Sequence, residues 1–142
     1  MKIYNAENQI LGRFCSVIAE KLLEGETIAI VNAERAVLTG NPRTKIEEYK
    51  HKYERGDPIH GPFFPKQPER ILRRTVRGML PWDRSRGRNA YRRLRVYAGI
   101  PEEMQGKENT FQKVEVADAD RLKTKFITLG QIAMQLGAKK RW

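Results

Sequence analysis

The most informative stretch for the fold is a continuous apolar run, Thr27-Ile28-Ala29-Ile30-Val31. Such a run is typical of a strand buried on both faces of a parallel sheet, because a half-exposed strand alternates apolar with polar side chains. Before it, Ile3-Tyr4 opens a short strand, and residues 14–23 carry apolar side chains at helical spacing until Gly25, a C-terminal cap. Strand, helix and buried strand in this order predict a βαβ unit.

The next segment predicts a further strand followed by a helix. Val37-Leu38-Thr39 has the apolar and β-branched side chains of a strand. Asn41 is a typical N-cap and Pro42 a typical first helical residue, so we expect a helix from there to about residue 53. Its expected inward-facing side chains are Ile46, Tyr49 and Tyr53.

The second half of the chain is expected to begin with a loop and to end with a helix. Residues 56–68 are rich in Pro and Gly, which predicts a long, stiff loop. A strand is expected over residues 110–116, and a last helix runs from Thr128, whose capping box with Gln131 marks its start, to Gly137. Together these elements predict one three-layer α/β domain over residues 1–142, with extra helices.

Basic charge is concentrated in one segment of the chain. The 142 residues include 28 Lys and Arg against 17 Asp and Glu, a formal net charge of +11. Residues 66–99, the basic segment, hold eleven of the basic residues, ten of them arginines, and two acidic ones, Glu69 and Asp83. Because arginine makes forked contacts to phosphate, the basic segment predicts a surface for a polyanion on a nearly neutral body.

Two arginine-rich helices, broken at Pro81, are expected within the basic segment. On each, arginines at helical spacing share one side and apolar side chains share the other, at 100° per residue. The first helix has Arg70, Arg73, Arg74 and Arg77 on one side and Ile71, Leu72, Val76 and Leu80 on the other. The second has Arg88, Arg92 and Arg95 opposite Ala90, Leu94, Tyr97 and Ala98.

These arginine faces have several alternative interpretations. The simplest is a solvated helix face stabilised by ion pairs, but two carboxylates cannot pair ten arginines. A polybasic helix on a membrane surface is a second possibility, although it needs no folded body. A helix that reads duplex DNA would mix arginine with Asn, Gln or Ser at base-contact positions. The nearly uniform arginine face favours recognition of phosphates and shape in folded RNA.

Signs of catalysis, cofactors and metals are weak. The chain has neither a P-loop nor a Gly-x-Gly-x-x-Gly after a strand, and His51 and His60 lack metal-binding partners at ligand spacing. We expect Cys15, among the apolar residues of its helix, to be a buried thiol. Glu34, after the central strand, is the one candidate acid or base, although a salt bridge or turn with Arg35 is the simpler interpretation. No run approaches the roughly 20 apolar residues of a membrane span, and the first five residues do not resemble a signal peptide. The single cysteine excludes an internal disulfide, so we expect a soluble intracellular protein.

Several motifs are similar to those of one known family. In chain order they are Leu11-Gly12-Arg13, Val31-Asn32-Ala33-Glu34, Thr39-Gly40-Asn41, Val76-Arg77-Gly78-Met79-Leu80-Pro81, Arg86-Gly87-Arg88, Leu94-Arg95-Val96-Tyr97-Ala98-Gly99-Ile100-Pro101, and Lys125-Phe126 with Leu129-Gly130. Over nearly the whole chain they resemble the signature of the universal large-subunit ribosomal protein L-thirteen family. Gly61-Pro62-Phe63-Phe64-Pro65, and a start without an N-terminal extension, resemble its archaeal and eukaryotic branch.

The resemblance implies a three-layer α/β/α fold with a four-stranded, mainly parallel sheet, to which the two arginine-rich helices are added. It also implies a structural protein of the cytoplasmic ribosome, with neither catalysis nor a cofactor, that binds large-subunit ribosomal RNA during early assembly beside neighbouring ribosomal proteins. No membrane and no small-molecule substrate are expected as partners. The residues expected to bind RNA are Arg13, Lys66, Arg70, Arg73, Arg74, Arg77, Arg84, Arg86, Arg88, Arg92, Arg93, Arg95, Lys139, Lys140 and Arg141.

Two other functions stay open from the residues alone. An RNA-modifying enzyme could hold its substrate on the same basic surface, and Glu34 is the only acid or base available to it at the sheet edge. A basic adaptor for an acidic protein is the other alternative, and it would bind its partner whether or not ribonuclease is present.

Overall fold

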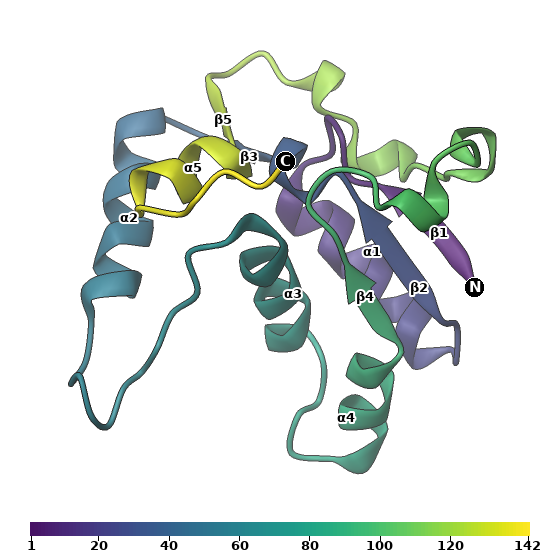
Figure 1. The fold of residues 1–142 in the computed structure, drawn as a ribbon, viewed down its shortest axis with the longest axis horizontal. Coiled ribbons are helices and arrows are strands. Elements are labelled where there is room, and N and C mark those ends of the chain that lie inside the picture. Colours follow the sequence, from purple (N-terminus) through teal and green to yellow (C-terminus); the bar gives the residue numbers. More distant parts are fainter.

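The computed structural model describes the backbone of residues 1–142 and every side chain except that of Arg121. At its centre lie three parallel strands, β1 (Lys2–Asn5), β2 (Ile28–Val31) and β4 (Leu94–Val96), in the order β1-β2-β4 (Figure 1). Ile30 of β2 is paired with Tyr4 on one side and with Val96 on the other. Helix α1 (Leu11–Leu23) begins three residues before the predicted start at residue 14 and connects β1 to β2, which confirms the βαβ order.

All of β2 is buried, and its side chains face two sides of the sheet. Ile28 and Ile30 belong to the main core, which α1 supplies with Phe14, Cys15, Ile18 and Leu22. Ala29 and Val31 face the other way and pack with Met104. The partly buried side chains around this second cluster are Ile3, Tyr97, Ile100 and Phe111. Burial of β2 on both faces is therefore confirmed.

The second face of the sheet is covered by an irregular segment. Its two turns, η2 (Glu102–Met104) and η3 (Glu108–Thr110), are short 3-10 helices. Pro101 precedes the first turn, and Gly106, between them, has a φ of +85°, a conformation that stops a helix. The layer of α-helix expected on this face is thus replaced by loop and single turns.

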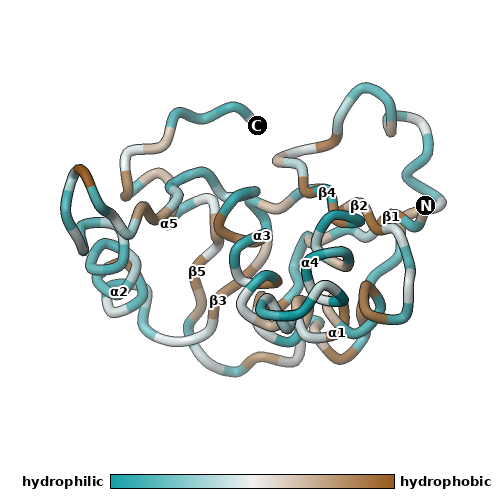
Figure 2. Tube along the Cα trace, turned by 90° about the horizontal axis from the view of Figure 1, so that it is seen from below, coloured by the Kyte–Doolittle hydropathy of each residue, from teal (hydrophilic) through white to brown (hydrophobic). Residues whose placement is uncertain are grey.

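Four further helices surround the sheet. They are α2 (Pro42–Glu54), α3 (Pro68–Gly78), α4 (Ser85–Arg92) and α5 (Leu129–Gln135). Helix α1 packs against α3 and α4, while α5 packs against α2 and α3. In Figure 1, α2 lies at the edge farthest from β1, and α3 and α4 follow one another beside β4. In Figure 2, α4 is coloured almost entirely hydrophilic, whereas hydrophilic and hydrophobic residues alternate along α3 because one of its faces is polar and the other apolar.

The four-stranded sheet that the resemblance implies is not what the structure contains. Strand β3 (Val37–Thr39) forms a separate antiparallel pair with β5 (Phe126–Thr128), so the two sheets have three and two strands. The β5 strand is missing from the sequence-based prediction because its three residues lead directly into α5. The capping box of Thr128 and Gln131 at the start of α5 is confirmed.

The strand predicted over residues 110–116 is wrong. Gln112 alone makes a parallel bridge to Tyr4, and the chain then enters another short turn, η4 (Glu115–Ala117). The backbone pairs with β1 at one point, with hydrogen bonds of 2.9 Å from Asn5 N–H to Gln112 O and from Gln112 N–H to Ile3 O. Turns on both sides of this contact prevent a longer ladder.

The second arginine-rich helix is shorter than predicted. Helix α4 ends at Arg92, and residues 94–96 form β4, so Arg95 lies on a strand and not on a helix face. Leu94-Arg95-Val96 fits both the alternation of a strand and one turn of a helix. Pairing with β2, which sets Leu94 opposite Ile28, selects the strand.

Candidate nucleic-acid interface

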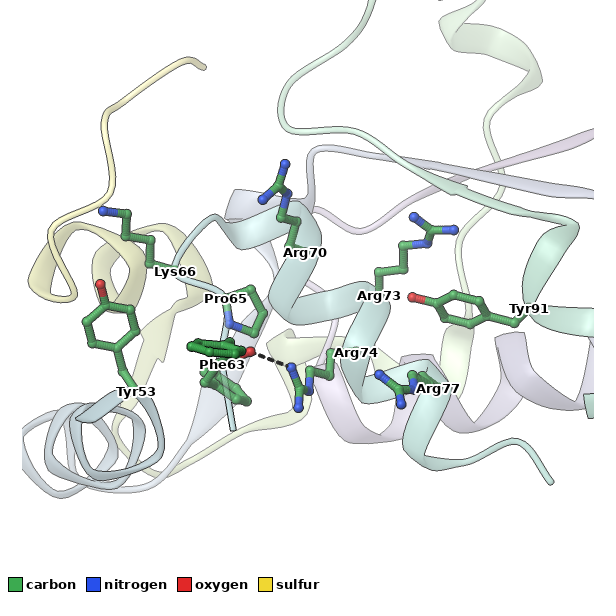
Figure 3. Close-up of a pocket in the computed structure, with 10 residues that line it drawn as sticks. Tyr53, Phe63, Pro65, Lys66, Arg70, Arg73, Arg74, Arg77 and Tyr91 are labelled. Carbon is green, nitrogen blue, oxygen red and sulfur yellow. Dashed lines mark hydrogen bonds between the residues drawn. The ribbon is translucent and has the colours of Figure 1, made fainter. Parts of the chain in front are cut away.

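Helix α3 separates apolar from arginine side chains as predicted. Pro68 occupies its first turn, where a missing N–H costs nothing. Ile71, Leu72 and Val76 are fully buried against the core. The arginines are Arg70 and Arg77, which are exposed, and Arg73 and Arg74, which are half-buried. They fan out along the opposite side of the helix (Figure 3).

A groove of about 610 Å³ follows this arginine side of α3 (Figure 3). Its lining residues are cationic or apolar, with two tyrosines. They are Lys66, Arg70, Arg73, Arg74 and Arg77 with Tyr53, Phe63, Phe64, Pro65 and Tyr91. No carboxylate is among the residues that line it, so its potential is strongly positive.

Aromatic rings connect the arginines of α3 with α4. The guanidinium of Arg73 lies 4.6 Å from the ring centroid of Tyr91, and that of Arg77 lies 4.6 Å from the ring centroid of Trp82. Trp82 and Tyr91 are themselves in edge contact, with centroids 5.2 Å apart. Each cation–π contact contributes about 0.5–1 kcal/mol at such a partly exposed site. These contacts fix the angle between the two helices and restrict the guanidinium groups.

The start of α4 is held close to Pro81. A β-carbon on Gly87 would overlap the carbonyl oxygen of Pro81, so only glycine permits this approach. Arg88 donates a 3.0 Å hydrogen bond from Nη1 to the carbonyl oxygen of Trp82. The exposed arginines around this helix are Arg84, Arg86, Arg88 and Arg92. The Arg86-Gly87-Arg88 motif thus combines a close backbone contact with two cationic side chains.

The charges of the basic segment are not neutralised by the side chains that the structure describes. Among the side chains that the structure describes, no carboxylate lies within 4.0 Å of a guanidinium or ammonium group of residues 66–99. The ion pairs that are present involve Lys2, Arg35, Arg43 and Lys45. Uncompensated charge of one sign opposes folding, and a bound polyanion offsets that cost.

Arg93 and Arg95, two arginines of the predicted set, contact the protein's own backbone away from the groove. Arg93 donates from Nη2 to the carbonyl oxygen of Leu22, at 2.6 Å, near the C-terminal end of α1. Arg95 donates from Nη1 to the carbonyl oxygens of Arg92 and Leu94, both at 3.2 Å. Arg93 is half-buried and Arg95 is exposed. Neither lines the groove along α3.

The remaining predicted residues lie elsewhere. Arg13 is exposed in the first turns of α1 and lines a different hollow, together with Lys45. Lys139, Lys140 and Arg141 are exposed in the tail that follows α5. The structure therefore brings together the predicted residues of α3 and of the segment before it, joins them to α4, and leaves these four apart.

The aromatic side chains of the interface were missed from sequence. Tyr53, expected to face inward from α2, is 39% exposed and lines the groove, whereas Tyr49 is buried as predicted. One turn separates the two tyrosines, and α2 ends one residue after Tyr53, beyond the reach of the core. The available signal was Phe63-Phe64, an aromatic pair in a Pro- and Gly-rich loop directly before the arginines.

Glu34, the candidate acid or base, is engaged in holding the fold. Its carboxylate accepts a 2.8 Å hydrogen bond from the backbone N–H of Gly99 and lies 3.7 Å from Nε of Arg35. The residue sits in a 3-10 turn, η1 (Ala33–Arg35), and is 6% exposed. The expected salt bridge and turn are both confirmed.

The thiol of Cys15 belongs to the core and is not part of a reactive site. Cys15 is fully buried, and burial raises the pKa of its thiol well above the ordinary range, so the thiol stays protonated. Among the described side chains, no three His, Cys, Asp or Glu residues gather as a metal site would require. Within the part of the chain described here, every helix is too short or too polar to cross a membrane.

The comparisons with known proteins agree with the motifs. The family model "Ribosomal protein L13" matches residues 1–103. The chain is 54% identical to the large ribosomal subunit protein uL13 of Archaeoglobus fulgidus, over 95% of this chain and 86% of the relative. It is 48% identical to the uL13 of Methanosarcina barkeri, over 98% of this chain and 99% of the relative, and 44% identical to that of Haloarcula marismortui, over 99% and 93%. This chain therefore belongs to the ribosomal protein L13 family, in its archaeal branch.

Proposed function

We propose that this protein is a structural constituent of the large ribosomal subunit. It binds large-subunit ribosomal RNA through α3, α4 and the groove along α3. The observation that carries the proposal is the set of eleven cationic side chains in residues 66–99, which no described carboxylate neutralises. Their near-uniform arginine character suits phosphates on a folded RNA surface. Membership of the ribosomal protein L13 family supports the same conclusion.

The arrangement of the helices suggests how binding would help assembly. Helices α3 and α4 lie on either side of Pro81, and Arg–aromatic contacts hold them against each other. The arginines of α3 and of α4 can therefore bind phosphates of two RNA segments at the same time and fix the two segments relative to each other. We propose that this happens early in subunit assembly in the cytoplasm, beside neighbouring ribosomal proteins, with Arg13 and the tail residues Lys139, Lys140 and Arg141 as separate contacts.

The RNA-modifying enzyme is not favoured by the geometry of its only candidate residue. Glu34 already accepts from the backbone of Gly99 and pairs with Arg35, so its carboxylate serves the fold. We accordingly propose a structural role without a catalytic step.

The test is a salt titration on a large-subunit ribosomal RNA fragment. Two triple variants to glutamine are compared with the unaltered protein: one of Lys66, Arg70 and Arg77, the other of Arg86, Arg88 and Arg92. All six side chains are exposed and lie outside the core, so the domain should stay folded. Loss of the contacts of Arg77 and Arg88 with Trp82 should affect only the packing of α3 on α4. Each lost phosphate contact should flatten the slope of log K against log salt by roughly 0.7–0.9, and each triple variant therefore by about 2–3.

A third triple variant serves as the matched control. Lys50, Lys107 and Lys113 are also exposed, lie outside the basic segment, and carry the same total charge. Their replacement by glutamine should leave the slope nearly unchanged. Equal slope losses in all three variants would mean that net charge alone governs binding, and the proposed interface would be wrong.

A further inference from the structure

Phe63 and Phe64 are neighbours in the chain but differ in exposure. Phe64 is half-buried, its ring centroid 6.0 Å from that of Tyr49, a buried residue of α2. The guanidinium of Arg74 lies 5.4 Å from the Phe64 ring, and its Nη1 donates a 2.8 Å hydrogen bond to the carbonyl oxygen of Phe63. The backbone here is thus tied to both α2 and α3. It presents the ring of Phe63 to solvent, 66% exposed.

The exposed ring of Phe63 offers apolar surface that a partner can cover. Phe63 is flanked by the exposed ring of Tyr53, and both line the cationic groove (Figure 3). Isolated apolar side chains on a surface are ordinary, but here two rings meet a row of unpaired cations. Aromatic rings beside cations suit a nucleotide, because its base can stack on a ring while its phosphate binds the cations.

The two hollows that Phe63 lines differ in charge. Phe63 and Tyr53 also line a second hollow of about 410 Å³, whose charged lining residues are Glu54, Arg55 and Asp57, two carboxylates against one guanidinium. No carboxylate is among the residues that line the groove along α3. Lys66 and Arg70, which do line it, project in similar directions in Figure 3. A phosphate is therefore attracted to the groove along α3 much more strongly than to the second hollow. The charge difference sets the hollow in which a nucleotide would lie.

We propose that the groove along α3 holds a single unstacked nucleotide of RNA, with its base on the rings of Phe63 and Tyr53 and its phosphates on Lys66 and Arg70. This inference rests on the proposed RNA-binding function and adds to it a preference for a base that lies outside the helical stack. The volume of about 610 Å³ is within the range of small-ligand sites, about 300–1,000 Å³. A fully paired helix offers no free base face, whereas a bulge does.

The experiment compares a fully paired RNA hairpin with a second hairpin that is identical except for one additional, bulged 2-aminopurine nucleotide. The full-length protein should bind the bulged hairpin at least about fivefold more tightly, since stacking of one base on an aromatic ring is worth that much or more. The fluorescence of 2-aminopurine should change on binding. Phe63→Leu, which keeps an apolar side chain but removes the stacking face, should abolish both the preference and the fluorescence change.

Two further variants make the result specific. Phe63→Trp keeps a stacking face and should retain the preference. Ile59→Ala removes a more exposed apolar side chain (79%) of the same loop that lines neither hollow, and it should have no effect. Equal, salt-dependent binding of both hairpins by all variants would overturn the nucleotide site and leave the proposed function standing. Failure of the unaltered protein to bind either hairpin in a salt-dependent manner would overturn both.

Discussion

Arg93 joins the RNA-binding segment to the body of the protein. Its guanidinium donates to the carbonyl oxygen of Leu22 near the negative end of the α1 dipole. We expect Arg93→Gln to lower the free energy of unfolding by about 1 kcal/mol, since a half-buried hydrogen bond from a charged donor is lost. It should flatten the salt slope of RNA binding less than Arg92→Gln does. Urea denaturation and a salt titration measure the two effects.

The neighbouring Arg92 is the control for this prediction. It is exposed, so Arg92→Gln should leave stability within about 0.5 kcal/mol and should flatten the salt slope by roughly 0.7–0.9. Equal slope losses in the two variants, with no loss of stability for Arg93→Gln, would identify Arg93 as a phosphate contact and not as an anchor of α1.

At the scale of the element, the position of α4 depends on the absence of a side chain at Gly87. Alanine is the better helix former by about 1 kcal/mol, but its β-carbon would overlap the carbonyl oxygen of Pro81. We expect the clash to prevail, so that Gly87→Ala lowers the free energy of unfolding by about 1–3 kcal/mol. Because α4 must move, the affinity for RNA should fall as well. Thermal melts and binding isotherms report the two changes.

Gly12 in α1 provides the matched helical glycine. A β-carbon there would meet no atom within 4 Å, so Gly12→Ala should stabilise the protein by up to about 1 kcal/mol. A Gly87→Ala variant that is also stabilised would show that α4 can shift away from Pro81 at little cost, and the angle between α3 and α4 would then be less rigid than we infer.

At the scale of the whole molecule, nearly all the net charge of +11 belongs to one segment. A protein built this way should be found with its polyanion in the cell. We expect the tagged protein in a lysate to sediment with large particles and to move to the slowly sedimenting fractions after ribonuclease treatment. Quantitative immunoblots across a sucrose gradient measure the shift. A distribution that is indifferent to ribonuclease would favour the basic adaptor for an acidic protein.

Local patterns in the sequence were sufficient for the parts of the fold that a single segment specifies. The apolar run of β2, the amphipathic spacing of α1 and α3, and the caps at Asn41 and Thr128 all lie where they were predicted. Each of these signals arises from the backbone geometry of one element, so no distant partner is needed to interpret it. The concentration of arginine on one side of α3 is of the same kind.

Tertiary contacts were needed wherever a short segment fits two structures. Residues 94–96 suit a helix or a strand, and hydrogen bonding with β2, far away in the chain, selects the strand and removes Arg95 from the predicted arginine face. The pairing of β3 with β5, and the contacts of Arg73 with Tyr91 and of Arg77 with Trp82, likewise join distant or differently oriented segments. Three-residue strands and side-chain contacts between elements leave little periodic signal, because the energy that fixes them comes from the partner and not from the segment itself.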